Sequence, residues 1–107
     1  MNSLRAELEP RKLTEHSLRA YCGNLNILSK GFTGSDYESH EFLHDFNGVI
    51  KWLEDRQKNE GLSDSCTRSY LSAICVALAP AGRWMPAREG CEEVTNKYKN
   101  YLRGLVN

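Results

Sequence analysis

The sequence predicts an all-α protein, a compact four-helix bundle formed by a single domain over residues 1–107. Three observations favour this fold class. Apolar residues recur at intervals of three and four in four separate segments, and no segment alternates apolar and polar residues as a half-buried strand does. Each segment is bounded by residues that cap or end helices. The length of 107 residues suits one hydrophobic core.

The first helix is predicted over residues 14–30. Thr14 supplies a capping hydroxyl, while Leu13 and Leu18 have the spacing of a hydrophobic staple. Gly31 is the expected stop, and a loop is expected from there to His44, in which Phe42 and Leu43 begin to turn inward. The apolar stripe of this helix comprises Leu18, Tyr21, Cys22, Leu25 and Leu28, and its polar stripe comprises His16, Arg19, Gly23, Asn26 and Lys30.

The second helix is predicted over residues 46–59, with Asp45 or Asn47 as its cap. Trp52 falls off the main apolar stripe of this helix. The residues at core spacing are Phe46, Val49, Ile50 and Leu53.

The third helix is predicted over residues 63–79 and ends at Pro80. Its inward face comprises Thr67, Tyr70, Leu71, Ile74, Cys75 and Leu78, and its opposite face comprises Ser65, Arg68, Ser69 and Ser72. After a loop over 80–90, a fourth helix is predicted over 91–106. The residues expected to face inward there are Val94, Tyr98, Tyr101, Leu102 and Leu105.

The distribution of charge is more informative than its sum. A net charge of zero argues against nucleic-acid binding, because DNA-binding domains usually carry a basic excess. However, residues 1–35 carry five basic and three acidic side chains, 36–64 carry three and eight, and 65–107 carry six and three. This pattern is compatible with one positive face and an acidic middle segment turned away from it, and equally with an ordinary mixed surface.

The four cysteines, Cys22, Cys66, Cys75 and Cys91, are expected to be reduced and structural. A metal site that combines them with His16, His40 or His44 is an open alternative, but neither a C-x-x-C nor an H-x-x-x-H spacing is counted in its support, and we expect no metal. No segment reaches the roughly 18 consecutive apolar residues of a membrane span, and the N-terminal residues are charged. We therefore expect a soluble, intracellular protein.

Two of the predicted helices begin alike. Residues 13–21 (LTEHSLRAY) are matched at a constant offset by residues 62–70 (LSDSCTRSY). Each segment has a leucine, a hydroxyl cap, a first-turn carboxylate, an arginine on the exposed face and a tyrosine two positions later. Arg19 and Arg68 therefore occupy equivalent places, from which an arginine can reach a phosphate. The alternative is that both are solvated surface residues.

These segments carry a resemblance to a known family. Residues 17–21 (SLRAY) fit the pattern S-x-R-x-Y, and residues 61–74 (GLSDSCTRSYLSAI) fit G-L-S-x-x-T-x-x-x-Y-L-S-A-I. With the intervening helix containing residues 49–54 (VIKWLE), the chain from about residue 13 to 78 resembles the N-terminal core-binding (SAM-like) domain of tyrosine recombinases and phage integrases.

The resemblance implies that the first and third helices lie against duplex DNA and contact its backbone phosphates. Partners would be duplex DNA, a C-terminal catalytic domain or recombinase protomers, with no cofactor and no small-molecule ligand. The family's catalytic residues belong to a second domain, so this chain is not expected to be an enzyme, and Tyr98 and Tyr101 are expected to be core residues. The implied phosphate contacts are Arg19 and Arg68, with His16, Ser69 and Ser72 as hydrogen-bonding residues and Lys12 and Lys30 as flanking charges.

A second hypothesis is a helical protein-interaction module that does not bind DNA. In this case Trp52, Trp84, Met85 and the tyrosine-rich last helix would form an apolar docking surface. The zero net charge and the acidic second helix favour it.

Overall fold

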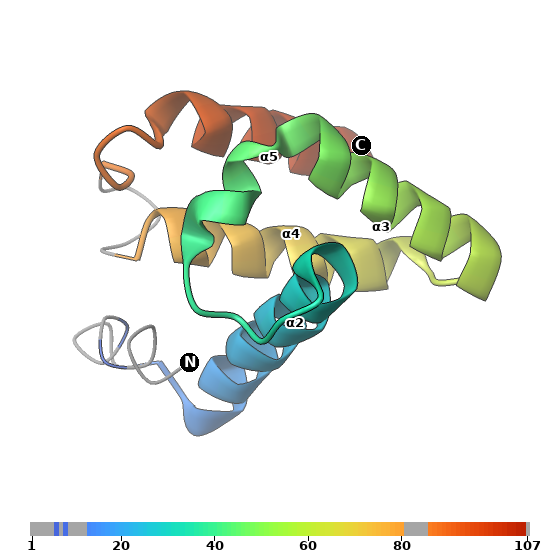
Figure 1. The fold of residues 1–107 in the computed structure, drawn as a ribbon, viewed down its shortest axis with the longest axis horizontal. Helices are drawn as coiled ribbons and strands as arrows, with labels where there is room; N and C mark the ends of the chain where they lie inside the picture. The colour runs from blue at the N-terminus through green and yellow to red at the C-terminus, as the bar shows by residue number, and fades with distance from the viewer. Residues whose placement is uncertain (1–5, 7, 9–12, 81–85, 107) are drawn as a thin grey trace.

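A computed structural model describes residues 6, 8, 13–80 and 86–106, which form an all-α four-helix bundle (Figure 1). The four helices of these ranges are α2 (Glu15–Thr33), α3 (Phe46–Glu60), α4 (Asp64–Leu78) and α5 (Glu92–Val106). A short 3-10 helix, η2 (His40–His44), lies between α2 and α3. The described residues include no strand. The predicted fold class is confirmed.

Side-chain caps fix where three of the helices begin. Thr14 Oγ1 accepts a hydrogen bond from the Ser17 amide at 3.1 Å, and Ser63 Oγ accepts one from the Cys66 amide at 3.3 Å. Of the two candidates for the start of α3, Asp45 is the cap, because its carboxylate accepts a hydrogen bond from the amide of Gly48. The predicted starts therefore agree with the structure to within one residue.

The predicted end of the first helix at residue 30 was wrong. Gly31 is helical, α2 continues to Thr33, and Gly34 ends it with a φ of 86° while its amide donates to the Lys30 carbonyl. Only glycine adopts this left-handed backbone without strain. The segment expected to be a loop up to His44 also contains η2, where Leu43 is fully buried.

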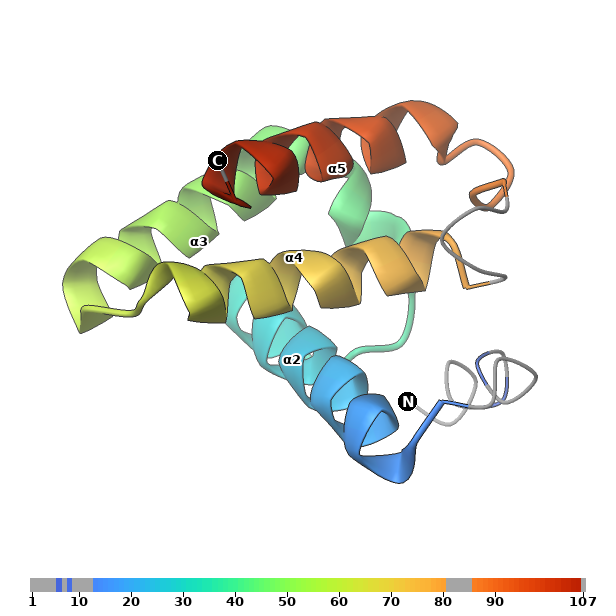
Figure 2. The ribbon, with the colours of Figure 1, turned by 180° about the vertical axis from the view of Figure 1, so that it is seen from behind.

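Helix α4 is the central element of the core. It makes its most extensive contacts with α2 and α5, and it also contacts α3 and η2 (Figure 2). The predicted inward face is confirmed, with Cys75 only half-buried. The buried residues of α4 are Thr67, Tyr70, Leu71, Ala73, Ile74, Ala77 and Leu78. Leu8, near the N-terminus, is also fully buried in this core.

Tyr98 packs α5 against α3 and η2, as expected for a core residue. Its ring is fully buried and lies edge-on to Phe46 with the centroids 5.0 Å apart, and its hydroxyl donates to the Leu43 carbonyl at 2.6 Å. Burial raises the pKa of Tyr98 well above that of an exposed tyrosine. Half-buried Tyr101 donates to the Glu54 carboxylate at 2.9 Å; burial, that hydrogen bond and the nearby charge raise its pKa to about 12.

Trp52 is half-buried and closes the junction of α2, α3 and α4. Its ring lies edge-on to Tyr70 at 6.3 Å, and the Arg56 guanidinium lies 5.2 Å from the ring centroid. The ring also lies directly over Gly31, so that a Cβ on residue 31 would collide with it. Gly31 is thus explained by a close approach between helices and not by a helix end.

The Gly31–Trp52 contact makes Gly31→Ala destabilising, although alanine is the better helix former. We expect a loss of about 1–3 kcal/mol in the free energy of unfolding, because the Trp52 ring has to move. Gly23→Ala in the same helix is the matched control, since nothing lies within 4 Å of its added Cβ. It should stabilise the protein by about 0.5–1 kcal/mol. Urea unfolding of both variants measures the two changes in free energy. If both variants are more stable than the wild type, the Trp52 ring does not restrict the side chain at position 31.

The burial of Tyr98 predicts how stability depends on alkaline pH. An unfolded chain loses the phenol proton near pH 10, whereas the folded protein holds it to higher pH, so stability falls as pH rises above 10. Tyr98→Phe should cost about 1–2 kcal/mol at pH 7, since it leaves the Leu43 carbonyl without this donor. Above pH 10 the variant should lose stability less steeply than the wild type. Parallel stability curves from pH 8 to 11 would contradict this account.

Candidate functional site

An open groove of about 570 Å³ lies where α2, α4 and the end of α5 meet. Its lining is mixed, with a guanidinium, three serine hydroxyls, an asparagine amide, a tyrosine and two apolar side chains. The lining residues are Ala20, Tyr21 and Asn24 from α2, Ser65, Arg68, Ser69 and Ser72 from α4, and Leu102 from α5.

The packing of α4 brings these polar residues to the groove. Because the apolar side chains of α4 point into the core, positions 65, 68, 69 and 72 lie together on its remaining face. The Arg68 guanidinium donates to Ser65 Oγ at 3.1 Å, and the Ser69 hydroxyl donates to the Ser65 carbonyl at 3.0 Å. The first of these bonds holds the guanidinium against the surface of α4 beside the groove.

The structure separates the predicted DNA-contacting residues into two groups. Arg68, Ser69 and Ser72 line the groove together. Arg19 does not line it; its side chain is 78% exposed and pairs with Glu15 at 3.3 Å, although it is adjacent in sequence to the groove residue Ala20.

The other predicted contacts lie away from the groove. His16 is exposed in the first turn of α2. Lys30 lies near the other end of the helix, where its ammonium group forms an ion pair with Asp36 at 3.2 Å. Lys12 lies outside the described residues. None of the residues of the predicted polar stripe of α2 lines the groove.

Asn24 and Tyr21 belong to the groove although sequence analysis did not place them there. Tyr21 was expected on the buried stripe and is half-buried, and Asn24 lies three positions further along, at the edge of that stripe. A residue at the boundary between the two faces of a helix can be assigned only when the crossing of the neighbouring helix is known.

The groove carries positive charge and the acidic segment lies elsewhere. Arg68 is the one charged residue among the described residues that line the groove. Residues 34–45 contain four carboxylates and no lysine or arginine. Figure 2 shows α4 in front and this segment passing behind it. None of the four carboxylates of this segment is among the residues that line the groove.

The aromatic residues of the alternative docking surface are largely engaged within the chain. Trp52 packs over Gly31 and against Tyr70, and Tyr98 is fully buried. Trp84 and Met85 lie outside the described residues. Within the described ranges, Ile27 is the large hydrophobic residue that is exposed.

The structure contains no disulfide between the four cysteines. Cys22 and Cys91 are buried, Cys75 is half-buried and Cys66 is exposed. Burial raises the pKa of the Cys75 and Cys91 thiols, which nearby Lys99 and Arg88 respectively oppose. A thiol that is buried and mostly protonated is a poor nucleophile.

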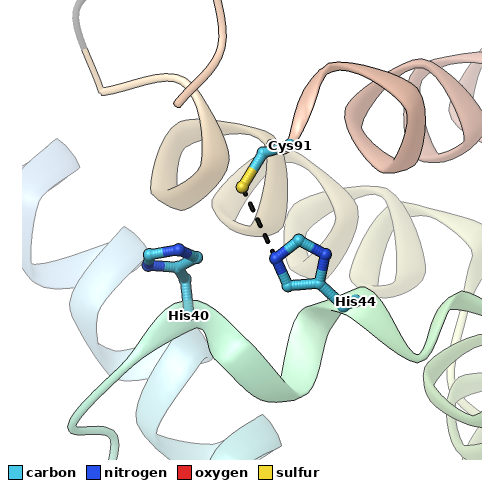
Figure 3. Close-up of side chains that lie close together, drawn as sticks. All are labelled: His40, His44 and Cys91. Atoms are coloured by element: carbon cyan, nitrogen blue, oxygen red, sulfur yellow. Dashed lines mark hydrogen bonds between the residues drawn. The ribbon is translucent and has the colours of Figure 1, made fainter. Parts of the chain in front are cut away.

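One cluster of potential metal ligands belongs to the alternative that the sequence analysis left open. His40 and His44 of η2 lie against Cys91, which directly precedes α5 (Figure 3). The sequence analysis was wrong to count no H-x-x-x-H spacing, because residues 40–44 have it and it was a signal for the histidine pair. Nothing in the sequence indicates that Cys91, 47 positions from His44, joins them. His16, the third histidine considered, is on α2 and takes no part.

Comparison of the chain with protein-family models, with curated proteins and with solved structures found no match. The likeness to recombinase core-binding domains therefore remains a prediction from the two sequence motifs. None of the described helices combines the length and the apolar composition needed to cross a bilayer.

The different burial of the cysteines predicts their reactivity. In the folded protein with a metal chelator present, one thiol of the four, Cys66, should react rapidly with dithionitrobenzoate. The others should react at rates limited by opening of the structure. Cys66→Ser should remove the fast phase, and a fast phase that persists in this variant would show that another thiol is accessible.

Proposed function

We propose that the chain is a DNA-binding module that grips duplex DNA through backbone phosphates, using the groove between α2 and α4. The observation that carries the proposal is the grouping of the Arg68 guanidinium with the hydroxyls of Ser65, Ser69 and Ser72 in an open groove. Among the described residues, no carboxylate lines this groove. Arginine, serine, asparagine and tyrosine side chains are the usual donors to phosphate oxygens.

Arg19 extends this surface along α2. Its ion pair with Glu15 is exposed, and a pair of this kind contributes little energy. A phosphate approaching α2 therefore competes with Glu15 at little cost for the same guanidinium. Arg19 and Arg68 are the arginines at equivalent places in the two matching segments, on the helices that the recombinase resemblance assigns to the DNA contact.

The chemistry of the surface favours recognition of the backbone over recognition of sequence. Reading base edges in the major groove usually requires several side chains such as Arg, Asn or Gln in a row on one helix. The groove offers one arginine and one asparagine from two different helices. With so few charges, we expect affinity on the order of micromolar or weaker at physiological salt.

Charge reversal at Arg68 tests the proposal. Fluorescence anisotropy of a labelled duplex should show binding to the wild type that weakens steeply with salt. Arg68→Glu should weaken binding by about tenfold or more at low salt and reduce the slope of log affinity against log salt by about one. Arg19→Glu should have a smaller effect in the same direction, because its guanidinium is partly neutralised by Glu15.

Lys51→Glu is the matched control, since it makes the same change of charge at an exposed position of α3. It should bind within about twofold of the wild type if the contact is local. Circular dichroism confirms that each variant folds, and Arg68→Gln serves if the reversal disturbs α4. Absence of duplex binding by the folded wild type at low salt, or equal losses in Arg68→Glu and Lys51→Glu, would overturn the proposal in favour of a protein-interaction module.

A further inference from the structure

His40, His44 and Cys91 form a cluster of potential metal ligands that is separate from the groove between α2 and α4. The potential ligand atoms of the three side chains lie within 4.8 Å of one another. Figure 3 shows both imidazoles on the side of η2 that faces Cys91, whose sulfur lies above and between them. Cys91 Sγ is 3.6 Å from His44 Nε2.

These distances are close to those of a tetrahedral metal site. Zinc binds cysteine sulfur at about 2.3 Å and histidine nitrogen at about 2.0–2.1 Å, which places the sulfur and a nitrogen about 3.6 Å apart. The Cys91–His44 pair already has this separation. The other distances, which are at most 4.8 Å, have to shorten by no more than about 1.5 Å, a change within reach of imidazole rotation.

Both sides of the cluster are held in place by hydrogen bonds that do not involve the ligand atoms. The Cys91 amide donates to the Arg88 carbonyl at 2.9 Å, and the Cys91 carbonyl accepts from the Thr95 amide at 2.9 Å. On the other side, Ser39 caps η2, and the Leu43 carbonyl accepts the buried Tyr98 hydroxyl. The sulfur and the two imidazoles are thus presented by backbone that is already ordered, which lowers the entropic cost of binding a metal.

The donor set and its surroundings favour zinc. One sulfur and two imidazole nitrogens suit a borderline-soft cation and not Mg²⁺ or Ca²⁺, which prefer oxygen ligands. Residues 34–45, which contain both histidines, carry four carboxylates and no lysine or arginine, and one of the four, Asp36, pairs with Lys30, so the segment keeps a negative balance that favours a cation. The positive charge of Arg88 lies near Cys91 and disfavours a bound cation. The Arg88 guanidinium is directed to the Ala77 carbonyl, to which it donates a hydrogen bond at 2.7 Å.

We propose that His40, His44 and Cys91 bind one zinc ion, with a water molecule in the fourth position on the exposed side of His44. The ion joins η2 to the start of α5, two segments 47 positions apart in sequence. Bound zinc stabilises the folded state, because the unfolded chain does not present the three ligands together. The site is independent of the DNA-binding groove, and it is tested without DNA.

Cobalt(II) reports on the site directly, because a bound thiolate gives a sulfur-to-cobalt charge-transfer band in the near ultraviolet. The reduced full chain should bind one equivalent of cobalt with this band, and zinc should displace it. Cys91→Ser should abolish the band. His44→Gln should weaken binding by at least about tenfold, and it leaves the core intact because His44 is exposed.

Two matched controls separate the site from adventitious binding. Cys66→Ser and His16→Gln remove an exposed cysteine and an exposed histidine outside the cluster, and both should bind cobalt as the wild type does. At the same zinc concentration, the unfolding temperature of the wild type and of both controls should rise, and that of His44→Gln should rise less. The proposal is overturned if the wild type shows no stoichiometric band, if His44→Gln binds like the wild type, or if Cys66→Ser removes the band.

Discussion

The burial of one face of α4 is the constraint on which the rest of this structure depends. This helix contacts α2, α3, α5 and η2, and its contacts with α2 and α5 are the most extensive between the described elements. Leu71, Ile74 and Leu78 are fully buried, and each such side chain contributes about 1.5–3 kcal/mol of hydrophobic stabilisation. Because this face has to point into the core, the polar residues of α4 are left on the opposite face, beside α2 and the end of α5. The position of the groove follows from the packing of the core.

The helices were predictable because their signals are local. The capping residues Thr14, Asp45 and Ser63 act on amides three positions away, and the apolar spacing of α4 marks its buried face without reference to any other helix. The errors in the fold arose where a distant contact decides the structure. Gly31 resembles a helix end in the sequence, but it is needed to admit the Trp52 ring, and the Leu43 carbonyl of η2 accepts a hydrogen bond from Tyr98 of the distant α5.

The candidate sites divide in the same way. Arg68, Ser69 and Ser72 were identified correctly as neighbours on one surface because they share a helix face. Their grouping with Arg19 and Lys30 was not reproduced, because the side of α2 that meets α4 depends on how the two helices cross. The His40–His44–Cys91 cluster lay beyond sequence reasoning for the same reason, since it requires the start of α5 to lie over η2. Local periodicity specifies faces, and tertiary packing decides which faces meet.

The central claim is that the α2–α4 groove is the surface that meets DNA, and the most direct test is to map that surface by NMR. Amide shifts of the isotope-labelled protein should be followed during titration with a short duplex at low salt. The account predicts that the largest perturbations fall at residues 19–24 of α2 and 65–72 of α4, with residues 34–45 and α3 unchanged. Perturbations centred on α3, or spread evenly over the surface, would contradict it.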